Sequence, residues 1–551
     1  MRAPFLGSRS FMTWHRIPWA PLLASALTFT ACTSSSSGTT ETPDASVSEP
    51  DASTSVEWDG GYVPLEEKGN TWPDAGPFAA CSFTVNTGDP CPEDFNVFDL
   101  SACNRESLAN ANTDGLFMLT TRTNQSPPAF SSITLRLGSD GGTQYLNNNP
   151  ITEQASDGNA RLYGTRLLMP NGRVLRTMLA TCEAPQAPEF TGCYAACNIN
   201  GKVSTLRTFK SQRPTTWRAG EAEASGLGLV SERLVDIGLP VDIYVTKNHA
   251  YVVSITGTLI GKGAGGLTVF DVSDKSAPKK VKTIQLETDN YWNGVWAKGD
   301  ALYVASADRG VLVFDITQPA DPQLVRNLPG GNTDVHTVFV DGDRLYAAAI
   351  NESVILFDIT NPLHPLELNR YSPDGALPHD MFAIGDRLYV SAMLSGFIVA
   401  DVRNPHDIRT LGQYTYAPPQ YAHHNAVGTF GGRTIAFEGG EGPGEHLRVL
   451  DITDPAHIVK IGEFQLRPEI SIHNMLLVGK KLYVAWYQEG VRVLDVSNPT
   501  KPTQVAHYNT YRETEADTGY HYVGAIGIRV PGDGFIYVVD TWRGLLILRE
   551  Q

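Results

Sequence analysis

The stretch "GVLVFDITQPADPQLV" (residues 310–325) decides the fold, because it returns along the chain with little change. A short apolar run ends in Asp, and a Pro-containing turn then leads into a second run that alternates apolar and polar residues. This alternation between turn residues predicts paired antiparallel strands. The other copies are "GLTVFDVSDKSAPKKV" (266–281), "SVILFDITNPLHPLEL" (353–368), "GFIVADVRNPHDIRTL" (396–411), "HLRVLDITDPAHIVKI" (446–461) and "GVRVLDVSNPTKPTQV" (490–505).

The spacing of these copies suits one blade of a β-propeller per repeat. Periods of about 40 to 50 residues are typical of such repeat folds. The repeated Asp recurs mostly every 43 or 44 residues, as Asp271, Asp315, Asp358, Asp401, Asp451 and Asp495. The pattern Gly-x-x-Val-x-Asp-Ile/Val-x-x-Pro resembles the LVIVD-repeat family over residues 229–551. This resemblance implies a propeller, in a family whose members are often exported and have no well-defined activity.

Seven blades are predicted, and a strand that precedes the first repeat is expected to close the ring. The seventh copy, "GAIGIRVPGDGFIYVVDTWRGLLILRE", ends where its third strand ends, with Arg549 in place of the repeat Asp. An orphan segment with outer-strand pattern, "LVSERLVDI", precedes the first copy. Its pairing with the last blade would leave no unpaired sheet edge at the seam.

The N-terminus predicts an exported lipoprotein. Arg2, Arg9 and Arg16 precede a short apolar run, and "FTAC" resembles a lipobox whose Cys32 becomes the lipid anchor. We expect a signal peptide over residues 1–31 and a disordered tether over 32–60, rich in Ser, Thr, Asp and Pro. By resemblance to Gram-negative sorting rules, the lack of Asp after Cys32 suggests the outer membrane or cell surface. Plain secretion, with Cys32 unmodified, is the alternative.

A small disulfide-containing β domain is expected over residues 61–214, followed by a linker over 215–228. Apart from the anchor, all the cysteines fall in this region, and an even set in an exported chain predicts up to three disulfides with fifteen alternative pairings. They are Cys81, Cys91, Cys103, Cys182, Cys193 and Cys197. Without residues 1–31 the formal net charge changes from −16 to −19, because three Arg and no acidic residue are removed. So acidic a chain is not expected to bind nucleic acid, or to contact a membrane other than through the anchor.

Histidines recur at one position of the repeat, the start of the first strand of a blade. His336, His379 and His473 each stand ten residues before the Tyr of the next strand, and His424 in "HHNAV" is the match in blade five. These four imidazoles from neighbouring blades form a candidate site for Fe, Cu or Zn. Glu438 or Glu441 would assist such a metal as a proton carrier or hydrogen-bond partner. The alternative is a structural role, in which each His serves hydrogen bonds within its own blade.

Loops on the same face supply a second set of candidates. The connections between second and third strands hold aromatic, acidic and Arg side chains, which suit sugar or peptide recognition if they are exposed. They are Asp308, Arg309, Trp486, Tyr487, Glu489, Asp540, Trp542 and Arg543.

Three functions follow from these patterns. The first is a cell-envelope lipoprotein whose propeller presents a binding face for a carbohydrate, a protein or a small molecule. The second is a metal-dependent oxidase or oxygenase at the four histidines, and the third is an envelope scaffold. The sequence contains no GxSxG, HExxH or Walker motif, so it leaves open whether the protein is an enzyme.

Overall fold

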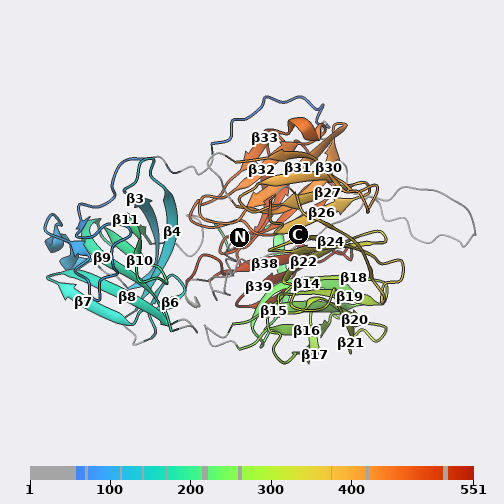
Figure 1. The fold of residues 1–551 in the computed structure, drawn as a ribbon, viewed down its shortest axis with the longest axis horizontal. Helices are drawn as coiled ribbons and strands as arrows, with labels where there is room; N and C mark the ends of the chain where they lie inside the picture. The colour runs from blue at the N-terminus through green and yellow to red at the C-terminus, as the bar shows by residue number, and fades with distance from the viewer. Residues whose placement is uncertain are drawn as a thin grey trace, which may run out of the picture.

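The computed structural model describes residues 57–551, except 69–71, 73, 112–113, 139–141, 169–171, 214–220, 258–262, 374, 417–420 and 513–518. The signal segment, Cys32 and most of the expected tether therefore lie outside the described residues. Two all-β bodies lie next to each other, a disulfide-bonded sheet and a propeller (Figure 1). No helix in the described part of the chain is long and apolar enough to cross a membrane.

The N-terminal body is a strongly curved β half-barrel built on a nine-stranded sheet in the order β6-β5-β4-β3-β11-β10-β9-β8-β7. A two-stranded β1-β2 sheet and a short 3-10 helix, Arg105–Asn110, lie beside it. The strands are β1 (Ser82–Phe83), β2 (Phe98–Asp99), β3 (Gly115–Thr123), β4 (Phe130–Leu137), β5 (Tyr145–Leu146), β6 (Asn149–Pro150), β7 (Glu153–Asp157), β8 (Ala160–Leu168), β9 (Val174–Gln186), β10 (Glu189–Cys197) and β11 (Val203–Gln212).

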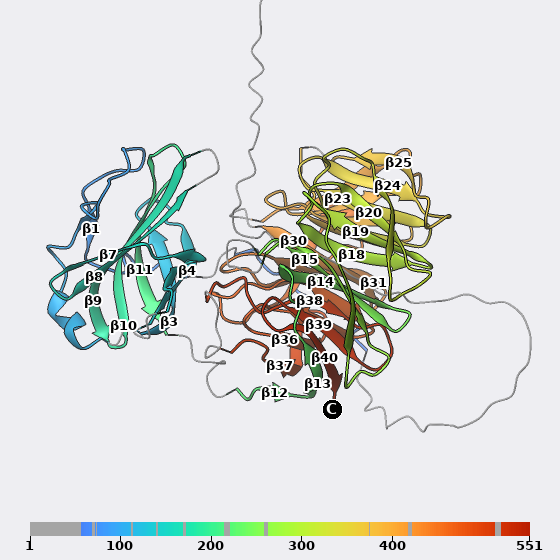
Figure 2. The same cartoon turned by 90° about the horizontal axis from the view of Figure 1, so that it is seen from below.

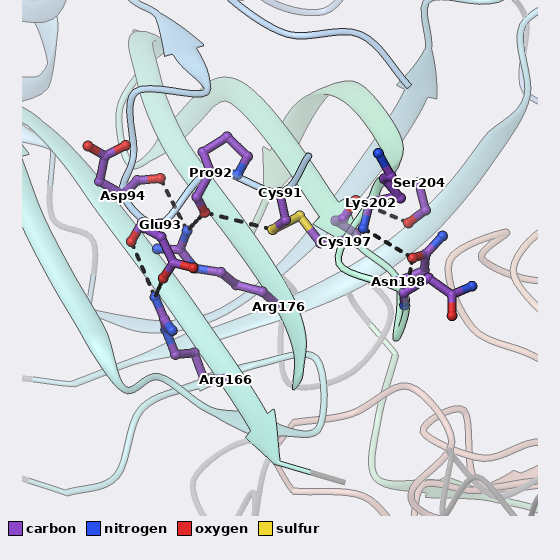
Figure 3. Close-up of a disulfide and its surroundings, with 12 residues drawn as sticks. Cys91, Pro92, Glu93, Asp94, Arg166, Arg176, Cys197, Asn198, Lys202 and Ser204 are labelled. Carbon is purple, nitrogen blue, oxygen red and sulfur yellow. Dashed lines mark hydrogen bonds and ion pairs between the residues drawn. A yellow bond between two sulfur atoms is a disulfide. The ribbon is translucent and has the colours of Figure 1, made fainter. Parts of the chain in front are cut away.

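Three disulfides join the irregular N-terminal segment of this body to its central strands. They are Cys81–Cys193, Cys91–Cys197 and Cys103–Cys182. Figure 3 shows the second one, beside which Arg176 donates hydrogen bonds to the carbonyls of Pro92 and Asp94. The prediction of a disulfide-containing β domain is confirmed, and one pairing of the fifteen is selected by the fold.

The second body is a seven-bladed propeller, as the repeat predicted. Its blades run β14–β17, β18–β21, β22–β25, β26–β29, β30–β33, β34–β37 and β38–β40. The strands of blades one to four are β14 (Leu239–Thr246), β15 (His249–Ile255), β16 (Gly266–Asp271), β17 (Lys279–Ile284), β18 (Trp292–Lys298), β19 (Ala301–Ser306), β20 (Gly310–Asp315), β21 (Gln323–Leu328), β22 (Val335–Asp341), β23 (Arg344–Ala349), β24 (Ser353–Asp358), β25 (Leu366–Tyr371), β26 (Asp380–Ile384), β27 (Arg387–Ser391), β28 (Phe397–Asp401) and β29 (Arg409–Tyr414).

Blades five to seven continue the ring, so that β38 lies against β14 and the inner strands enclose the propeller axis. Blade five also carries a short 3-10 helix, Pro455–His457. The strands are β30 (Ala422–Phe430), β31 (Arg433–Gly440), β32 (Leu447–Asp451), β33 (Val459–Phe464), β34 (Met475–Val478), β35 (Lys481–Ala485), β36 (Val491–Asp495), β37 (Thr503–Tyr508), β38 (Ala525–Arg529), β39 (Ile536–Asp540) and β40 (Gly544–Glu550).

The orphan strand closes the ring, as predicted. β13 (Leu227–Arg233) pairs antiparallel with β40 as the outer strand of blade seven. The preceding β12 (Ala224–Ser225) pairs with β37 of blade six (Figure 2). The segment that we expected to be a linker therefore connects blades six and seven.

Residues 57–68 lie along blade five, not within the N-terminal body. The amide of Leu65 donates to the carbonyl of Lys460 at 2.8 Å, and Arg433 donates to the carbonyl of Gly60 at 2.8 Å. Glu67 accepts a hydrogen bond from the buried Arg448 at 3.1 Å. This segment is the blue trace above β33 in Figure 1. The chain that leads in from the expected tether is therefore attached to the propeller before it enters the half-barrel.

Candidate metal centre

A row of imidazoles lies at the end of the propeller axis where the inner strands begin, which we call the upper end. The rings of His336, His379, His423 and His473 follow one another with centroid distances of 4.6, 4.5 and 4.4 Å. They belong to blades three to six, and each side chain is between 0% and 4% exposed. The structure thus brings the predicted histidines of these four blades together, with one exchange.

That exchange is in blade five, where His423 and not His424 stands in the row. β30 pairs with β31 through Ala422 and then His424, which leaves His423 as the extra residue of a β-bulge. The same bulge occurs at His336 in blade three. Bulges re-aim a side chain without ending the strand. His424 turns toward Asp380 instead, with 3.7 Å between Nε2 and Oδ2.

A buried carboxylate faces two of these rings. Glu441 follows the end of β31, and its Oε2 lies 3.7 Å from His423 Nε2. Its Oε1 lies 3.8 Å from His473 Nε2 and accepts a hydrogen bond from the Tyr487 hydroxyl at 2.6 Å. Burial raises the pKa of Glu441 well above its usual range. Of the two glutamates that the sequence offered as partners of a metal, Glu441 is thus the one beside the histidine row.

The tautomer of His473 is fixed by the backbone. Its Nδ1 lies 2.8 Å from the carbonyl oxygen of Ile526. A carbonyl only accepts hydrogen bonds, so Nδ1 carries the proton and Nε2 presents its lone pair toward Glu441. A ring nitrogen held in this way by a backbone carbonyl is usual for metal-binding histidines.

The donor set fits a transition metal. One ligand atom each from His423, His473 and Glu441 lie within 4.8 Å of one another. Ligand atoms around a tetrahedral metal with bonds of 2.0–2.2 Å lie about 3.3–3.6 Å apart, so the three side chains would have to close by up to about 1.5 Å. Two imidazoles and one carboxylate suit Fe, Zn or Cu and leave coordination positions free. Burial keeps the neighbouring His336 and His379 neutral, with the pKa of His336 lowered to about 3 and that of His379 well below its ordinary value.

Tyrosines enclose this centre on the side of blades five to seven. The Tyr487 ring lies 4.8 Å from His473 and 5.4 Å from Tyr522, and Tyr421 lies 5.2 Å from His379. Tyr487 has a φ of 35°, a left-handed conformation that a bulky residue adopts at a cost of about 1–3 kcal/mol. This conformation directs its hydroxyl to Glu441. The sequence did not reveal this contact.

Below the histidines, the axis is filled by a polar layer and then by aromatic rings. Thr337 donates a hydrogen bond to Asp380 at 3.0 Å, and Asp242 accepts the amide of Val295 at 2.9 Å. Four aromatic rings, one from each of blades one to four, pack the lower end: Tyr244, Trp296, Phe339 and Phe382. The Arg529 guanidinium stacks 4.6 Å from the Tyr244 ring. Among the described side chains along the axis, the group of three ligand atoms that could hold a metal lies at the upper end.

The loop residues expected to form an exposed binding face are mostly buried, so that expectation is wrong for Trp486, Tyr487, Glu489 and Asp540. Trp486 packs against Phe464 and donates to the carbonyl of Ile470 at 3.3 Å. Large rings at these positions fill the spaces between blades, which sequence periodicity does not reveal.

The charged loop residues bind their own blades. Glu489 pairs with Arg467 at 2.6 Å, and Asp540 accepts the amides of Trp542 and Arg543. Arg543 pairs with Glu232 of the closing strand. Asp308 accepts the amide of Asn290 at 3.4 Å, and Arg309 lies 3.5 Å from Asp289. Only Trp542, 37% exposed, remains as an exposed large ring of this set.

Comparison with known proteins identifies the repeat. The family model of the LVIVD repeat matches residues 238–285, 291–328, 332–372 and 473–510. No curated protein matches the sequence.

Two solved structures are similar in fold. The computationally designed Ika8 protein is 10% identical, covers 73% of this chain and 97% of its own, and has a TM-score of 0.40. The WD40 β-propeller domain of Doa1 is 12% identical, covers 59% of this chain and 98% of its own, and has a TM-score of 0.44.

Proposed function

We propose that this chain, an LVIVD-repeat β-propeller protein, is an exported metalloprotein in which His423, His473 and Glu441 hold one Fe, Cu or Zn ion. The observation that carries the proposal is the convergence of two imidazole nitrogens and a carboxylate on one buried point, with the His473 tautomer set by Ile526.

The repeat fold is typical of a binding or scaffold protein, and the candidate metal centre would be the place where such a protein binds its ligand. Three protein ligands leave coordination positions for a small molecule. The Tyr487 hydroxyl at Glu441 would orient the carboxylate and supply a proton donor beside a bound ligand. In the oxidase or oxygenase hypothesis from the sequence, His423 therefore takes the place of His424 as a ligand. His336 and His379 would line the site as neutral side chains.

Export and anchoring form a separate part of the proposal. Three disulfides are typical of proteins that fold in an oxidising compartment. We propose that Cys32 carries lipid and that the tether places the propeller at the outer membrane or cell surface, as the lipobox-like "FTAC" suggests. Detergent partitioning of the expressed protein tests this, because Cys32→Ser should move it from the detergent phase to the aqueous phase.

Elemental analysis of the purified full-length protein tests the metal centre. We expect about one equivalent of Fe, Cu or Zn per chain after loading and desalting, lost in His423→Ala and in Glu441→Gln. The matched control is His424→Ala, the next residue on the same strand, which should keep its metal. Equal metal content in wild type and His423→Ala, with both proteins folded by circular dichroism, would contradict the proposal.

A further inference from the structure

The N-terminal half-barrel contains a groove that the metal centre does not use. It has a volume of about 560 Å³ and lies between β1, the turn after β3 and the first half of β11. Pockets for small ligands usually have volumes of about 300–1,000 Å³. Among the residues that line it, Arg207 is the one that carries a charge, and no acidic residue takes part.

Arg207 is half-buried and has no carboxylate partner among the described residues. One guanidinium nitrogen donates to Thr121 Oγ1 at 2.8 Å, whereas Nε is buried without a hydrogen-bond partner among the described residues. By contrast, Arg176, Arg448 and Arg492 each pair with a glutamate, at 2.6, 2.9 and 2.6 Å. A half-buried cation without a counter-ion is costly, and an anionic ligand would restore the pairing.

The rest of the lining is neutral and suits hydroxyl groups. Asn86, Asn124 and Gln125 are exposed and offer amide donors and acceptors at the rim. The half-buried ring of Phe83, held 6.1 Å from Phe98, offers a flat apolar surface. A sugar acid combines its carboxylate with several hydroxyls, which the amides at the rim can bind, whereas a chain of acidic amino acids offers no hydroxyls.

We propose that this groove binds an acidic saccharide, with the carboxylate of a uronic acid at Arg207 and the sugar hydroxyls at the amides of Asn86, Asn124 and Gln125. The site is independent of the metal centre, because its residues all belong to the half-barrel. It gives the expected carbohydrate partner a location other than the propeller loops.

Calorimetric titration of the full-length protein with trigalacturonic acid tests this. Charged hydrogen bonds contribute about 1.5–3 kcal/mol, so Arg207→Gln should weaken binding by roughly 10- to 150-fold. The matched control is Arg161→Gln, an exposed arginine on β8 outside the groove, which should bind like wild type. Asn124→Ala, at the rim, should weaken binding without removing charge, and His423→Ala should leave it unchanged.

Two comparison ligands decide the chemistry. Neutral galactotriose and triglutamate should each bind at least about tenfold more weakly than trigalacturonic acid. No detectable binding of trigalacturonic acid, or equal binding by wild type and Arg207→Gln, would overturn the assignment. Triglutamate binding as tightly would overturn the saccharide and make the groove an acidic-peptide site.

Discussion

Tyr487 shows how a single residue connects the repeat to the candidate centre. It occupies the turn between the second and third strands of blade six, where the chain needs a left-handed residue. Gly490 closes this turn by donating to the carbonyl of Tyr487 at 2.9 Å. A Gly would fit the backbone of position 487 more easily. The phenol's hydrogen bond to buried Glu441 gives a reason for the more costly residue.

Tyr487→Phe should weaken metal binding by about 10- to 100-fold, because Glu441 loses the partner that orients it. The ring remains, so packing against His473 and Tyr522 is preserved. The control is Tyr421→Phe, since the Tyr421 hydroxyl has no hydrogen-bond partner in the described residues. Competition with a chromophoric chelator measures both affinities. A similar affinity for the two variants would mean that Tyr487 acts by packing alone.

Asp242, on inner strand β14, predicts a pH dependence of stability. Burial raises its pKa to about 7, although Arg529 and the amide of Val295 act in the opposite direction. The folded state therefore holds a proton between about pH 4 and pH 7 that the unfolded chain releases, and stability falls as pH rises through this range. Asp242→Asn should match wild type near pH 4 and be more stable by about 1–4 kcal/mol at pH 8.

Thermal unfolding of both proteins at pH 4, 6 and 8 measures this difference. Asn keeps an oxygen for the Val295 amide, so the comparison isolates the charge. A loss of stability at pH 8 would show that attraction to Arg529 outweighs the cost of burying the carboxylate.

At the scale of elements, the propeller ring is completed by two strands that precede its first blade in the sequence. β13 supplies the outer strand of blade seven, and β12 extends blade six. Leu227 of β13 is 1% exposed and lies in a cluster with Leu546 and Leu548 of β40. The pairing of β13 with β40 covers the edge that β40 would otherwise expose. The stability of the seam therefore controls that of the whole propeller.

Leu227→Ala should lower the free energy of unfolding by about 2–5 kcal/mol, as usual for a buried Leu. Leu229→Ala is the matched control two residues along the strand, because Leu229 is 38% exposed and should cost under about 1 kcal/mol. Urea unfolding followed by tryptophan fluorescence compares the two. Equal losses would mean that β13 does not pack as a closing strand.

For the whole molecule, two bodies are held by different means. The half-barrel closes long loops with disulfides whose cysteines are 112, 106 and 79 residues apart. The propeller contains no disulfide among its described residues and relies on apolar packing between blades. They meet where Leu116 lies against Gly519, at a φ of +74°, so closely that a Cβ on the glycine would be 2.3 Å from Leu116 Cδ1.

Reduction should therefore affect the two bodies unequally. Each disulfide across a loop of this length contributes about 4–5 kcal/mol in the chain-entropy account, so the half-barrel should lose most of its stability. Calorimetry with and without dithiothreitol should show one transition shifted strongly downward and another nearly unchanged. A single transition that shifts as a unit would instead mean that the two bodies unfold together.

The sequence by itself determined the repeat, the seven blades, the closing strand and the disulfide domain. These follow from patterns that recur, because each blade must bury the same faces and each edge must be paired. It also identified the histidine position in three blades, since His336, His379 and His473 keep the same distance from the second-strand Tyr.

Only the tertiary structure decided which groups face one another. A bulge in β30 turns His423 and not His424 into the row, and adjacent histidines in a sequence do not show which one is unpaired. The burial of Trp486 and Tyr487, the choice among disulfide pairings and the meeting of Glu441 with two imidazoles all depend on contacts between blades or between distant strands. Such contacts depend on register and on strand twist, which local patterns of apolar residues leave undetermined.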